Sequence, residues 1–262
     1  MHREARQIAI ESFLQKMEFA SLEDLAAQTG ASVSTVRRDL AVLESRGLVR
    51  RTHGGARLEK SRPIEEDNGW IESGMKRIAE KDRIARACAS LVEFDSSVIL
   101  DAGTTVHAVA RALRERRPQI VTNSLLIANQ YASDSQIEVV VSGGVIYPRL
   151  GVLVGPLAVQ AFANINVDYA ILSAGGLTDE GLMNSHTLLI DIQREMLRAA
   201  KTVIMCLDHS KFDRKSITSL CGLDQIDVVV TDREPSRSWR QRLESAGVQL
   251  VVAVHDFQPI AG

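Results

Sequence analysis

Seven short apolar runs alternate with amphipathic segments from residue 98 onward, and this alternation limits the fold more than any other feature. The runs have the length and β-branched content of buried strands; they are 98–100, 120–122, 137–141, 169–172, 203–207, 228–230 and 248–252. Apolar residues at helical spacing lie between several of them, in 106–114, 157–164, 189–200 and 237–246. Strands that alternate with helices favour a mostly parallel sheet covered by helices. We therefore predict an α/β domain over residues 76–253.

Loops rich in small and hydroxyl residues follow five of the predicted strands, at 101–105, 122–124, 142–144, 173–176 and 208–212. Ligands of open α/β sheets bind beyond the carboxyl ends of the strands, and backbone N–H groups at helix N-termini suit phosphate. Gly and Ser also serve plain turns, so each loop alone is weak evidence, but five together indicate a phosphometabolite site. The candidate residues are Asp101, Gly103, Thr104, Thr105, Asn123, Ser124, Gly143, Gly144, Gly175, Gly176, Asp208 and Lys211. In this hypothesis Lys211 supplies a cation, and Asp101 and Asp208 accept hydrogen bonds from sugar hydroxyls.

The first 58 residues follow a different pattern, with three helical segments in quick succession. Apolar spacing predicts one helix around Ile10 and Leu14, a second capped by Ser21, and a third capped by Ser32. Gly30 supplies the turn between the second and third, because a left-handed backbone costs glycine little. This order is typical of a helix-turn-helix.

A basic hairpin is predicted next, since 47–56 reads as two short strands around a glycine turn, the wing of a winged helix. The outward face of the third helix carries hydroxyls and guanidinium groups that a DNA major groove accepts, and the wing would contact the backbone. The candidate DNA-binding residues are Ser32, Ser34, Thr35, Arg37, Arg38, Arg50, Arg51 and His53. Asp39 is expected to pair with an arginine, because a carboxylate facing phosphate would be repelled. The order of elements favours a winged helix-turn-helix that binds DNA over a generic three-helix domain with a charged face.

The charge distribution agrees with this division. Residues 1–58 hold nine Lys/Arg and seven Asp/Glu, a balance of +2; the totals of 31 and 33 leave 22 and 26, or −4, for the remainder. The asymmetry is modest. Its informative part is the position of the arginines, at 37–38 and 50–51, where a DNA-binding fold needs them.

Other classes of protein are disfavoured by the sequence. No apolar run approaches the roughly 20 residues that span a bilayer, and the first ten residues lack the apolar stretch of a secretory signal. We expect a cytoplasmic protein that does not contact a membrane.

Cysteine and histidine usage predicts neither a metal nor a cofactor. Cys88, Cys206 and Cys221 are an odd, widely spaced set that fits neither a disulfide framework nor a zinc site, so reduced, buried thiols are expected. His186 lacks two further ligands nearby and is interpreted as a packed or solvent-facing residue.

Two sets of motifs resemble the DeoR family of bacterial regulators. Arg6, Ile10 and Leu14, followed by 32–40 (SVSTVRRDL), are similar to its helix-turn-helix signature, and 51–56 (RTHGGA) to its wing-to-linker sequence. The five loops resemble its C-terminal sensor domain, over about residues 76–253. The resemblance implies a fold related to ribose-5-phosphate isomerase and CoA transferases. It also implies that a phosphorylated sugar or related metabolite binds and alters DNA affinity.

One stretch departs from the family pattern. After 180–182 (EGL), many members continue with Thr-Thr and a Glu-Ala pair that opens the next helix, whereas 183–191 here reads MNSHTLLID. Position 213 is Asp, where Gly often follows the Lys-Phe pair. Both departures lie beside the predicted pocket, so they bear on the identity of the ligand more than on its class.

The favoured function is a repressor of a carbohydrate-metabolism operon, with a DNA-binding domain over 1–58, a linker over 59–75, a sensor domain over 76–253 and a tail over 254–262. A homodimer or homotetramer assembled through the larger domain is expected, because paired readers match repeated half-sites. One alternative is a sugar-phosphate isomerase-like or CoA transferase-like enzyme, since Asp101, Asp208 and Lys211 are suitable for acid–base chemistry. Such an enzyme has no use for a DNA reader. Another alternative is a non-specific nucleic-acid-binding protein with a vestigial sensor domain.

Overall fold

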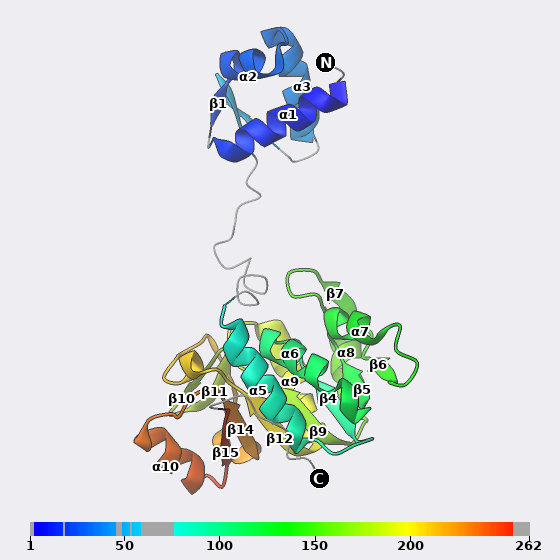
Figure 1. Ribbon diagram of the computed structural model, residues 1–262, viewed down its shortest axis with the longest axis vertical. Helices are drawn as coiled ribbons and strands as arrows, with labels where there is room; N and C mark the ends of the chain where they lie inside the picture. The colour runs from blue at the N-terminus through cyan, green and yellow to red at the C-terminus, as the bar shows by residue number, and fades with distance from the viewer. Residues whose placement is uncertain (1–2, 18, 46–48, 53, 59–75, 254–262) are drawn as a thin grey trace. The chain divides into compact units, whose positions relative to one another are not determined.

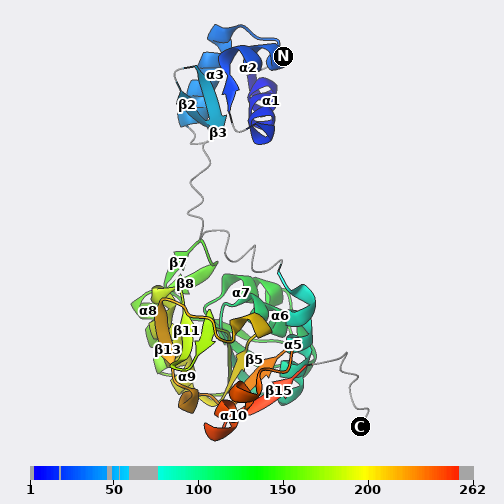
Figure 2. The same ribbon diagram turned by 90° about the vertical axis from the view of Figure 1, so that its left-hand side faces the viewer.

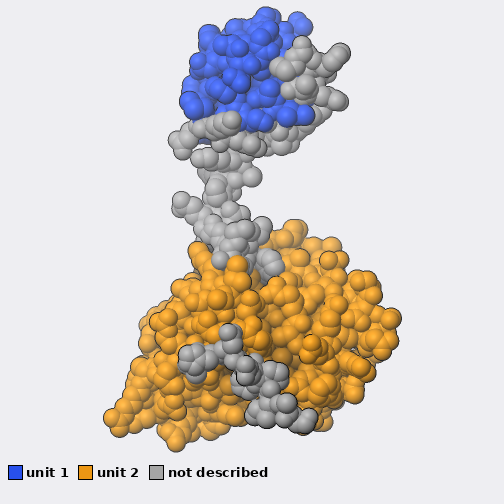
Figure 3. Space-filling view, in the orientation of Figure 1, with its two compact units in different colours: residues 1–68 blue, residues 69–262 orange. Residues whose placement is uncertain are grey.

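A computed structural model describes residues 3–17, 19–45, 49–52, 54–58 and 76–253. The chain divides into two compact units, Met1–Asn68 and Gly69–Gly262 (Figures 1 and 3). The predicted linker 59–75, the predicted tail 254–262 and His53 lie outside the described residues.

The first unit consists of three helices and a small antiparallel sheet. The helices are α1 (Arg3–Lys16), α2 (Leu22–Thr29) and α3 (Val33–Ser45). The strands β1 (Ala20–Ser21), β2 (Val49–Thr52) and β3 (Gly55–Leu58) pair in the order β1-β3-β2. A Cβ atom on Gly55 would collide with the carbonyl oxygen of Ala20, so only glycine lets β1 approach β3 this closely. The predicted helices and the basic hairpin are confirmed.

Local signals explain where these helices begin and end. Ser21 Oγ accepts a hydrogen bond from Asp24 N (3.0 Å) while Asp24 Oδ2 accepts from Ser21 N (3.1 Å), a capping box that starts α2. Gly30 ends α2 with φ of +65°. The buried core between the helices includes Ile10, Leu14, Leu25, Val36, Leu40 and Leu43.

The second unit is built around a seven-stranded parallel sheet with the order β15-β14-β12-β9-β4-β5-β6. Its strands are β4 (Ser97–Leu100), β5 (Gln119–Thr122), β6 (Val139–Val141), β9 (Val167–Leu172), β12 (Ala200–Cys206), β14 (Val228–Thr231) and β15 (Gln249–Val252). Each contains one of the seven predicted runs or most of it. The prediction of a mostly parallel α/β domain is therefore confirmed.

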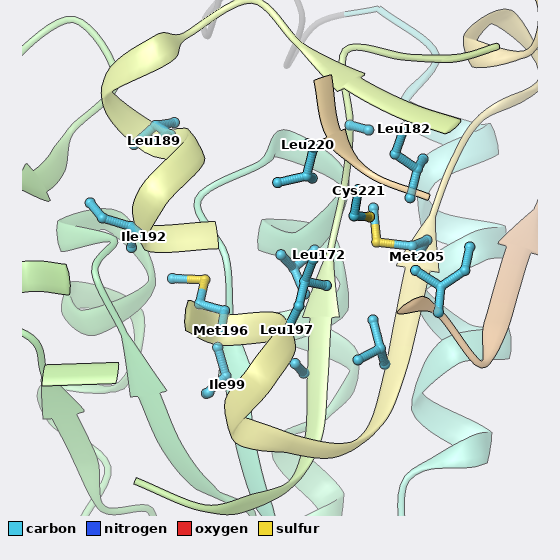
Figure 4. Close-up of a cluster of buried hydrophobic side chains, with 14 of the residues drawn as sticks. Ile99, Leu172, Leu182, Leu189, Ile192, Met196, Leu197, Met205, Leu220 and Cys221 are labelled. Atoms are coloured by element: carbon cyan, nitrogen blue, oxygen red, sulfur yellow. The ribbon is translucent and has the colours of Figure 1, made fainter. Parts of the chain in front are cut away.

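Helices cover both faces of this sheet (Figures 1 and 2). One core contains side chains of α5 (Ile78–Leu91), α6 (Thr104–Ala112) and α7 (Leu125–Tyr131), and the other contains side chains of α8 (Pro156–Ala163), α9 (Thr187–Ala199) and α10 (Arg237–Ser245). Successive strand residues alternate between the two, so that Val98 and Leu100 belong to the first core and Ile99 to the second. Figure 4 shows Met196 and Leu197 of α9 in the second core.

Several short elements escaped the sequence patterns. They are the hairpin β7 (Val145–Tyr147) and β8 (Val152–Val154), the sheet of β10 (Gly176–Thr178), β11 (Gly181–Asn184) and β13 (Thr218–Cys221), and the 3₁₀ turns Arg114–Arg116, His209–Lys211 and Leu223–Gln225. The hairpin lies next to α8 (Figure 2). The strand predicted over 137–141 begins only at Val139.

Two further expectations concern the second unit. Cys88, Cys206 and Cys221 are free and buried, as predicted. Across the described ranges, no helix is long and apolar enough to cross a membrane.

Candidate functional site

The outward face of α3 carries the predicted hydroxyl and guanidinium groups. Ser32, Ser34, Arg37 and Arg38 are exposed and Thr35 is half-buried. Ser32 Oγ accepts a hydrogen bond from Thr35 N (3.3 Å) and lies 2.9 Å from both Ser34 Oγ and Thr35 Oγ1. Ser32 therefore caps α3, as predicted, and three hydroxyls gather at the N-terminus of the helix.

A buried ion pair fixes α3 against α1. Arg6 Nε lies 2.5 Å from Asp39 Oδ2, and Gln7 Nε2 lies 3.4 Å from Asp39 Oδ1. The prediction that Asp39 pairs with an arginine is confirmed.

In the wing, Arg50 and Arg51 of β2 are both exposed. The backbone N–H of Arg51 donates to Glu44 Oε1 (3.0 Å), and Arg51 Nε lies 3.8 Å from Glu44 Oε2. This contact joins the wing to the last turns of α3, so Arg51 already has an acidic partner, whereas Arg50 forms no ion pair among the described residues.

In the second unit, all five predicted loops lie at one edge of the sheet. They follow β12, β9, β4, β5 and β6, which are five adjacent parallel strands. Their backbones approach closely at glycines: a Cβ on Gly103 would lie 3.1 Å from Ser173 Cβ, and one on Gly176 would collide with the Arg214 carbonyl oxygen. Gly143 and Gly144 are exposed and have φ of +72° and +116°.

Asp101 is buried where β4 ends, directly before α6. Gln193 Nε2 on α9 donates to its Oδ2 (2.8 Å), while its Oδ1 is buried and makes no hydrogen bond of good geometry within the described chain. Burial raises the pKa of this carboxyl, and the backbone amide of Ala102, the Gln193 side chain and the backbone amide of Ser173 partly offset that effect. The edge thus contains a buried carboxylate oxygen that lacks a well-aligned hydrogen-bond donor. It lies next to Thr104, which is half-buried, and Thr105, which is buried.

A second buried acceptor follows the neighbouring strand β5. Asn123 Nδ2 donates to the carbonyl oxygen of Leu153 (3.1 Å), which leaves Asn123 Oδ1 buried without a hydrogen-bond partner among the described residues. Ser124 Oγ accepts from Ile127 N (3.3 Å) and so caps α7. This cap gives Ser124 a structural task that the sequence did not reveal.

Positive charge collects at the other end of the row, after β12. Asp208 Oδ1 accepts from the N–H and hydroxyl of Ser210 and lies 3.7 Å from Arg77 Nε. Burial alone would raise the pKa of Asp208, but these hydrogen bonds together with Lys211 and Arg77 outweigh it and leave the pKa lowered. Burial lowers the pKa of both Lys81 and Lys211, and the Asp208 carboxylate partly offsets it. Three cations thus surround a single carboxylate.

Four residues of this edge escaped the sequence analysis: Arg77, Lys81, Asn184 and Gln193. Arg77 is the N-cap of α5 and Lys81 lies in its first turn, so neither residue stands in one of the strand-end loops. Gln193 lies 92 residues from the carboxylate it contacts. Only Asn184 carried a signal, because it lies in the stretch 183–191 that departs from the family pattern.

No three His, Cys, Asp or Glu side chains of the described chain gather as a metal ion would require. His186 is half-buried and precedes α9.

Comparison with known protein families identifies both units. The family model described as the DeoR-like helix-turn-helix domain matches residues 6–62, and that of the DeoR C terminal sensor domain matches residues 76–233. The chain belongs to the DeoR family. Its relatives are DNA-binding transcription regulators, and this regulator is similar to them over nearly its whole length.

Three relatives illustrate the family. The HTH-type transcriptional repressor GlcR of Bacillus subtilis is 32% identical over 98% of both chains. The glycerol-3-phosphate regulon repressor of Escherichia coli is 30% identical over 95% of this chain and 99% of its own. The L-fucose operon activator of Haemophilus influenzae is 28% identical over 89% of this chain and 93% of its own.

Solved structures show weaker similarity to this DeoR-family chain. Ribose 5-phosphate isomerase A from Methanocaldococcus jannaschii is 18% identical with a TM-score of 0.37, covering 52% of this chain and 54% of its own. The delta subunit of eIF2B from Chaetomium thermophilum is 15% identical with a TM-score of 0.43, covering 87% of both chains. Similarity at this level carries no argument about catalysis.

Proposed function

We propose that this regulator represses a carbohydrate-metabolism operon, and that its affinity for operator DNA falls when a phosphorylated sugar or related metabolite binds at the carboxyl edge of the seven-stranded sheet. The observation that carries the proposal is the polarity of this edge. Three cations surround Asp208 after β12, and two buried acceptor atoms that lack a well-aligned donor, Asp101 Oδ1 and Asn123 Oδ1, follow β4 and β5. Because the same chain contains a helix-turn-helix, a ligand bound at this site could change the affinity of the chain for DNA.

The two ends of the edge suit the two ends of a phosphorylated polyol. Lys211, with Lys81 and Arg77, would hold the phosphate, and Asp101 Oδ1 and Asn123 Oδ1 would accept from hydroxyls. Only β9 separates β12 from β4, so the two ends lie about 10 Å apart at the usual strand spacing. The proposed effector contacts come from Asp101, Gly103, Thr104, Thr105, Asn123, Ser124, Gly143, Gly144, Gly175, Gly176, Asp208 and Lys211.

DNA contacts are proposed for α3 and the wing. Arg37 and Arg38 would enter the major groove, and Arg50 and Arg51 would contact phosphates. Ser32, Ser34, Thr35 and His53 complete the proposed set. GlcR and the glycerol-3-phosphate regulon repressor support repression as the sign of control.

Self-association through the larger domain is also part of the proposal, with a second copy of this chain as the partner. Five exposed apolar side chains lie close together in sequence on β6, β7 and α8: Val140, Val141, Val145, Ile146 and Leu157. The run 139–147 contains no charged residue, and β6 is an edge strand. An uncharged apolar edge strand is complementary to the same edge of a second copy, and it promotes aggregation unless another surface covers it. Both halves of a repeated operator could then be read at once.

Catalysis is not part of the proposal. An isomerase needs a free general base, and one of the candidates, Asp208, already accepts two hydrogen bonds from Ser210 that help to lower its pKa. We assign 1–58 to DNA binding, 59–75 to a linker, 76–253 to effector sensing and 254–262 to a tail. A transcription regulator must meet the chromosome, so we propose that the chain acts in the cytoplasm.

A fluorescence-anisotropy titration tests the proposed function. The full chain is titrated against DNA upstream of its own gene at stated salt, with and without glycerol 3-phosphate, ribose 5-phosphate, fructose 6-phosphate and glucose 6-phosphate. Sequence-preferring binding that one compound weakens is the expected result. Equal affinity for unrelated duplexes would favour the non-specific alternative, and turnover of a sugar phosphate would favour the enzyme.

A further inference from the structure

A directed chain of hydrogen bonds leads from the backbone of residue 185 to the buried carboxylate at the end of β4. Ser185 N donates to Asn184 Oδ1 (2.8 Å), Asn184 Nδ2 donates to Gln193 Oε1 (3.0 Å), and Gln193 Nε2 donates to Asp101 Oδ2 (2.8 Å). Gln193 is 1% exposed and Asp101 is 3% exposed. The relay thereby joins the end of β11 and helix α9 to the loop after β4, which lies 92 residues before Gln193.

The direction of this relay is fixed at its far end. A backbone N–H can only donate, so Ser185 requires the oxygen of the Asn184 amide to face it. The Asn184 NH₂ group must then face Gln193, which turns the Gln193 oxygen toward Asn184 and its NH₂ group toward Asp101. The usual ambiguity of amide orientation is removed at both side chains, because the reversed arrangement would bring acceptors together.

The relay determines how each oxygen of the Asp101 carboxylate can form hydrogen bonds. Its Oδ2 is satisfied as an acceptor, and its Oδ1 is buried without a hydrogen bond of good geometry. The groups that oppose the effect of burial on the pKa of Asp101 are the neutral backbone amides of Ala102 and Ser173 and the neutral Gln193 side chain. A buried acceptor that lacks a well-aligned donor is costly until such a donor reaches it.

We propose that Asn184 and Gln193 are positioning residues that hold Asp101 as a hydrogen-bond acceptor, so that the site selects effectors carrying a hydroxyl or amino group for Oδ1. This inference rests on the proposed function for its ligand and on the relay for its geometry. It also gives a role to the stretch 183–191, which departs from the family pattern: Asn184 sets the polarity of the site from within that stretch.

The test reverses the relay with a single substitution, Asn184→Asp. The new carboxylate still accepts from Ser185 N but cannot donate to Gln193. Gln193 then donates to residue 184 and turns its oxygen toward Asp101, which takes up a proton in response. We expect ¹³C-carboxyl NMR of the full chain, with Asp101→Asn to assign the resonance, to show a higher pKa for Asp101 in the variant than in the wild type.

Two further variants separate polarity from general damage. Asn164→Asp makes the same change at an exposed residue that follows α8, and it should leave the pKa of Asp101 unchanged. Asn184→Asp combined with Gln193→Lys restores a donor toward Asp101, because an ammonium group can donate to both carboxylates, and it should lower the pKa again. An unchanged pKa in Asn184→Asp, or a rise of the same size in Asn164→Asp, would overturn the positioning role.

Calorimetry with the same four sugar phosphates tests the second part of the inference, that Asp101 Oδ1 selects the effector. We expect the wild type to bind at least one of them, and Asn184→Asp to bind it about 10-fold or more weakly near neutral pH, with recovery as the pH rises and Asp101 ionises. Binding that is unaffected at every pH would overturn the inference while leaving the proposed function in place. If none of the four compounds binds the wild type, both the proposed effector class and the proposed selection by Asp101 Oδ1 are wrong. The NMR result then still decides whether Asn184 and Gln193 position Asp101.

Discussion

The Arg6 guanidinium and the Asp39 carboxylate meet at 2.5 Å, joining the first helix of the chain to the helix that carries the proposed DNA-reading face. Both side chains are largely withdrawn from solvent, with 14% and 3% of their surfaces exposed. Removing one member of such a pair leaves the other charge buried and uncompensated. The orientation of α3 therefore depends on this contact.

Asp39→Ala should destabilise the N-terminal unit by about 3–5 kcal/mol, because Arg6 loses its buried partner. Hydrogen exchange of the α3 amides in the full chain measures the effect. Glu234→Ala removes one member of the exposed pair Arg240–Glu234 and should cost less than about 1 kcal/mol. Equal protection of α3 in the wild type and in Asp39→Ala would show that the pair contributes nothing.

Arg38→Ala and Arg37→Ala should each weaken DNA binding, since both side chains project from the outward face of α3. An arginine that reads a base should cost about 1–3 kcal/mol and relax specificity at one operator position, whereas one that contacts phosphate should lower the salt slope by about 1. Anisotropy titrations at several salt concentrations distinguish the two. Arg198→Ala, on the exposed surface of α9, serves as the control; unchanged affinity in both α3 variants would refute the proposed reading face.

Gly176→Ala should abolish the response to effector while leaving DNA affinity intact in its absence. The added Cβ would collide with the Arg214 carbonyl oxygen, so the loop after β9 must move. Gly247→Asn is the matched control, because Gly247 has φ of +76°, open space around it and no place in the proposed site. A normal effector response in Gly176→Ala would count against this loop as part of the site.

Val145→Lys should shift the full chain toward the monomer, because it places a charge in the exposed apolar run of β6 and β7. Light scattering at micromolar concentration measures the mass. Ile217→Lys changes another exposed apolar residue, outside this run, and should leave the mass unchanged. If the wild type is already monomeric, or if Val145→Lys keeps the wild-type mass, the proposed self-association surface is wrong.

The stability of the wild type relative to Asp101→Asn should fall as the pH rises above about 4, the value at which an unfolded aspartate ionises. Burial raises the pKa of Asp101, so the folded state holds this proton more tightly than the unfolded state and its contribution is complete only at lower pH. Urea unfolding from pH 4 to pH 8, followed through the buried Trp239 with Trp70 replaced by Phe, gives the difference at each pH. A difference that stays constant or grows with pH would contradict a raised pKa.

The spacing of apolar residues predicted most helices and sheet strands of this molecule, because each of these elements buries one or both of its faces. The seven sheet strands were predictable since apolar runs such as 98–100 face a core on both sides. Strands of three residues, such as Val145–Tyr147, are too short to establish a period of two, and both Val145 and Ile146 are exposed. These elements depend on tertiary contacts that a local pattern does not contain.

The candidate site was predictable loop by loop but not as a network. Asp101 and Lys211 stand in recognisable motifs at strand ends. Gln193 reaches Asp101 only because α9 packs on the sheet at β9 and β12, and Lys81 reaches the vicinity of Asp208 from the start of α5. Such pairings are set by the packing of helices on the sheet, which a single sequence does not encode in its spacing.

The most direct test of the central claim measures whether the carboxyl edge controls the DNA reader. Lys211→Ala and the wild type are titrated against the same operator DNA, each with and without the sugar phosphate that weakens wild-type binding. We expect the two proteins to bind DNA with equal affinity without the compound, and only the wild type to lose affinity when the compound is added. If Lys211→Ala releases DNA at the same concentration of the compound, the proposed site is not where the effector acts.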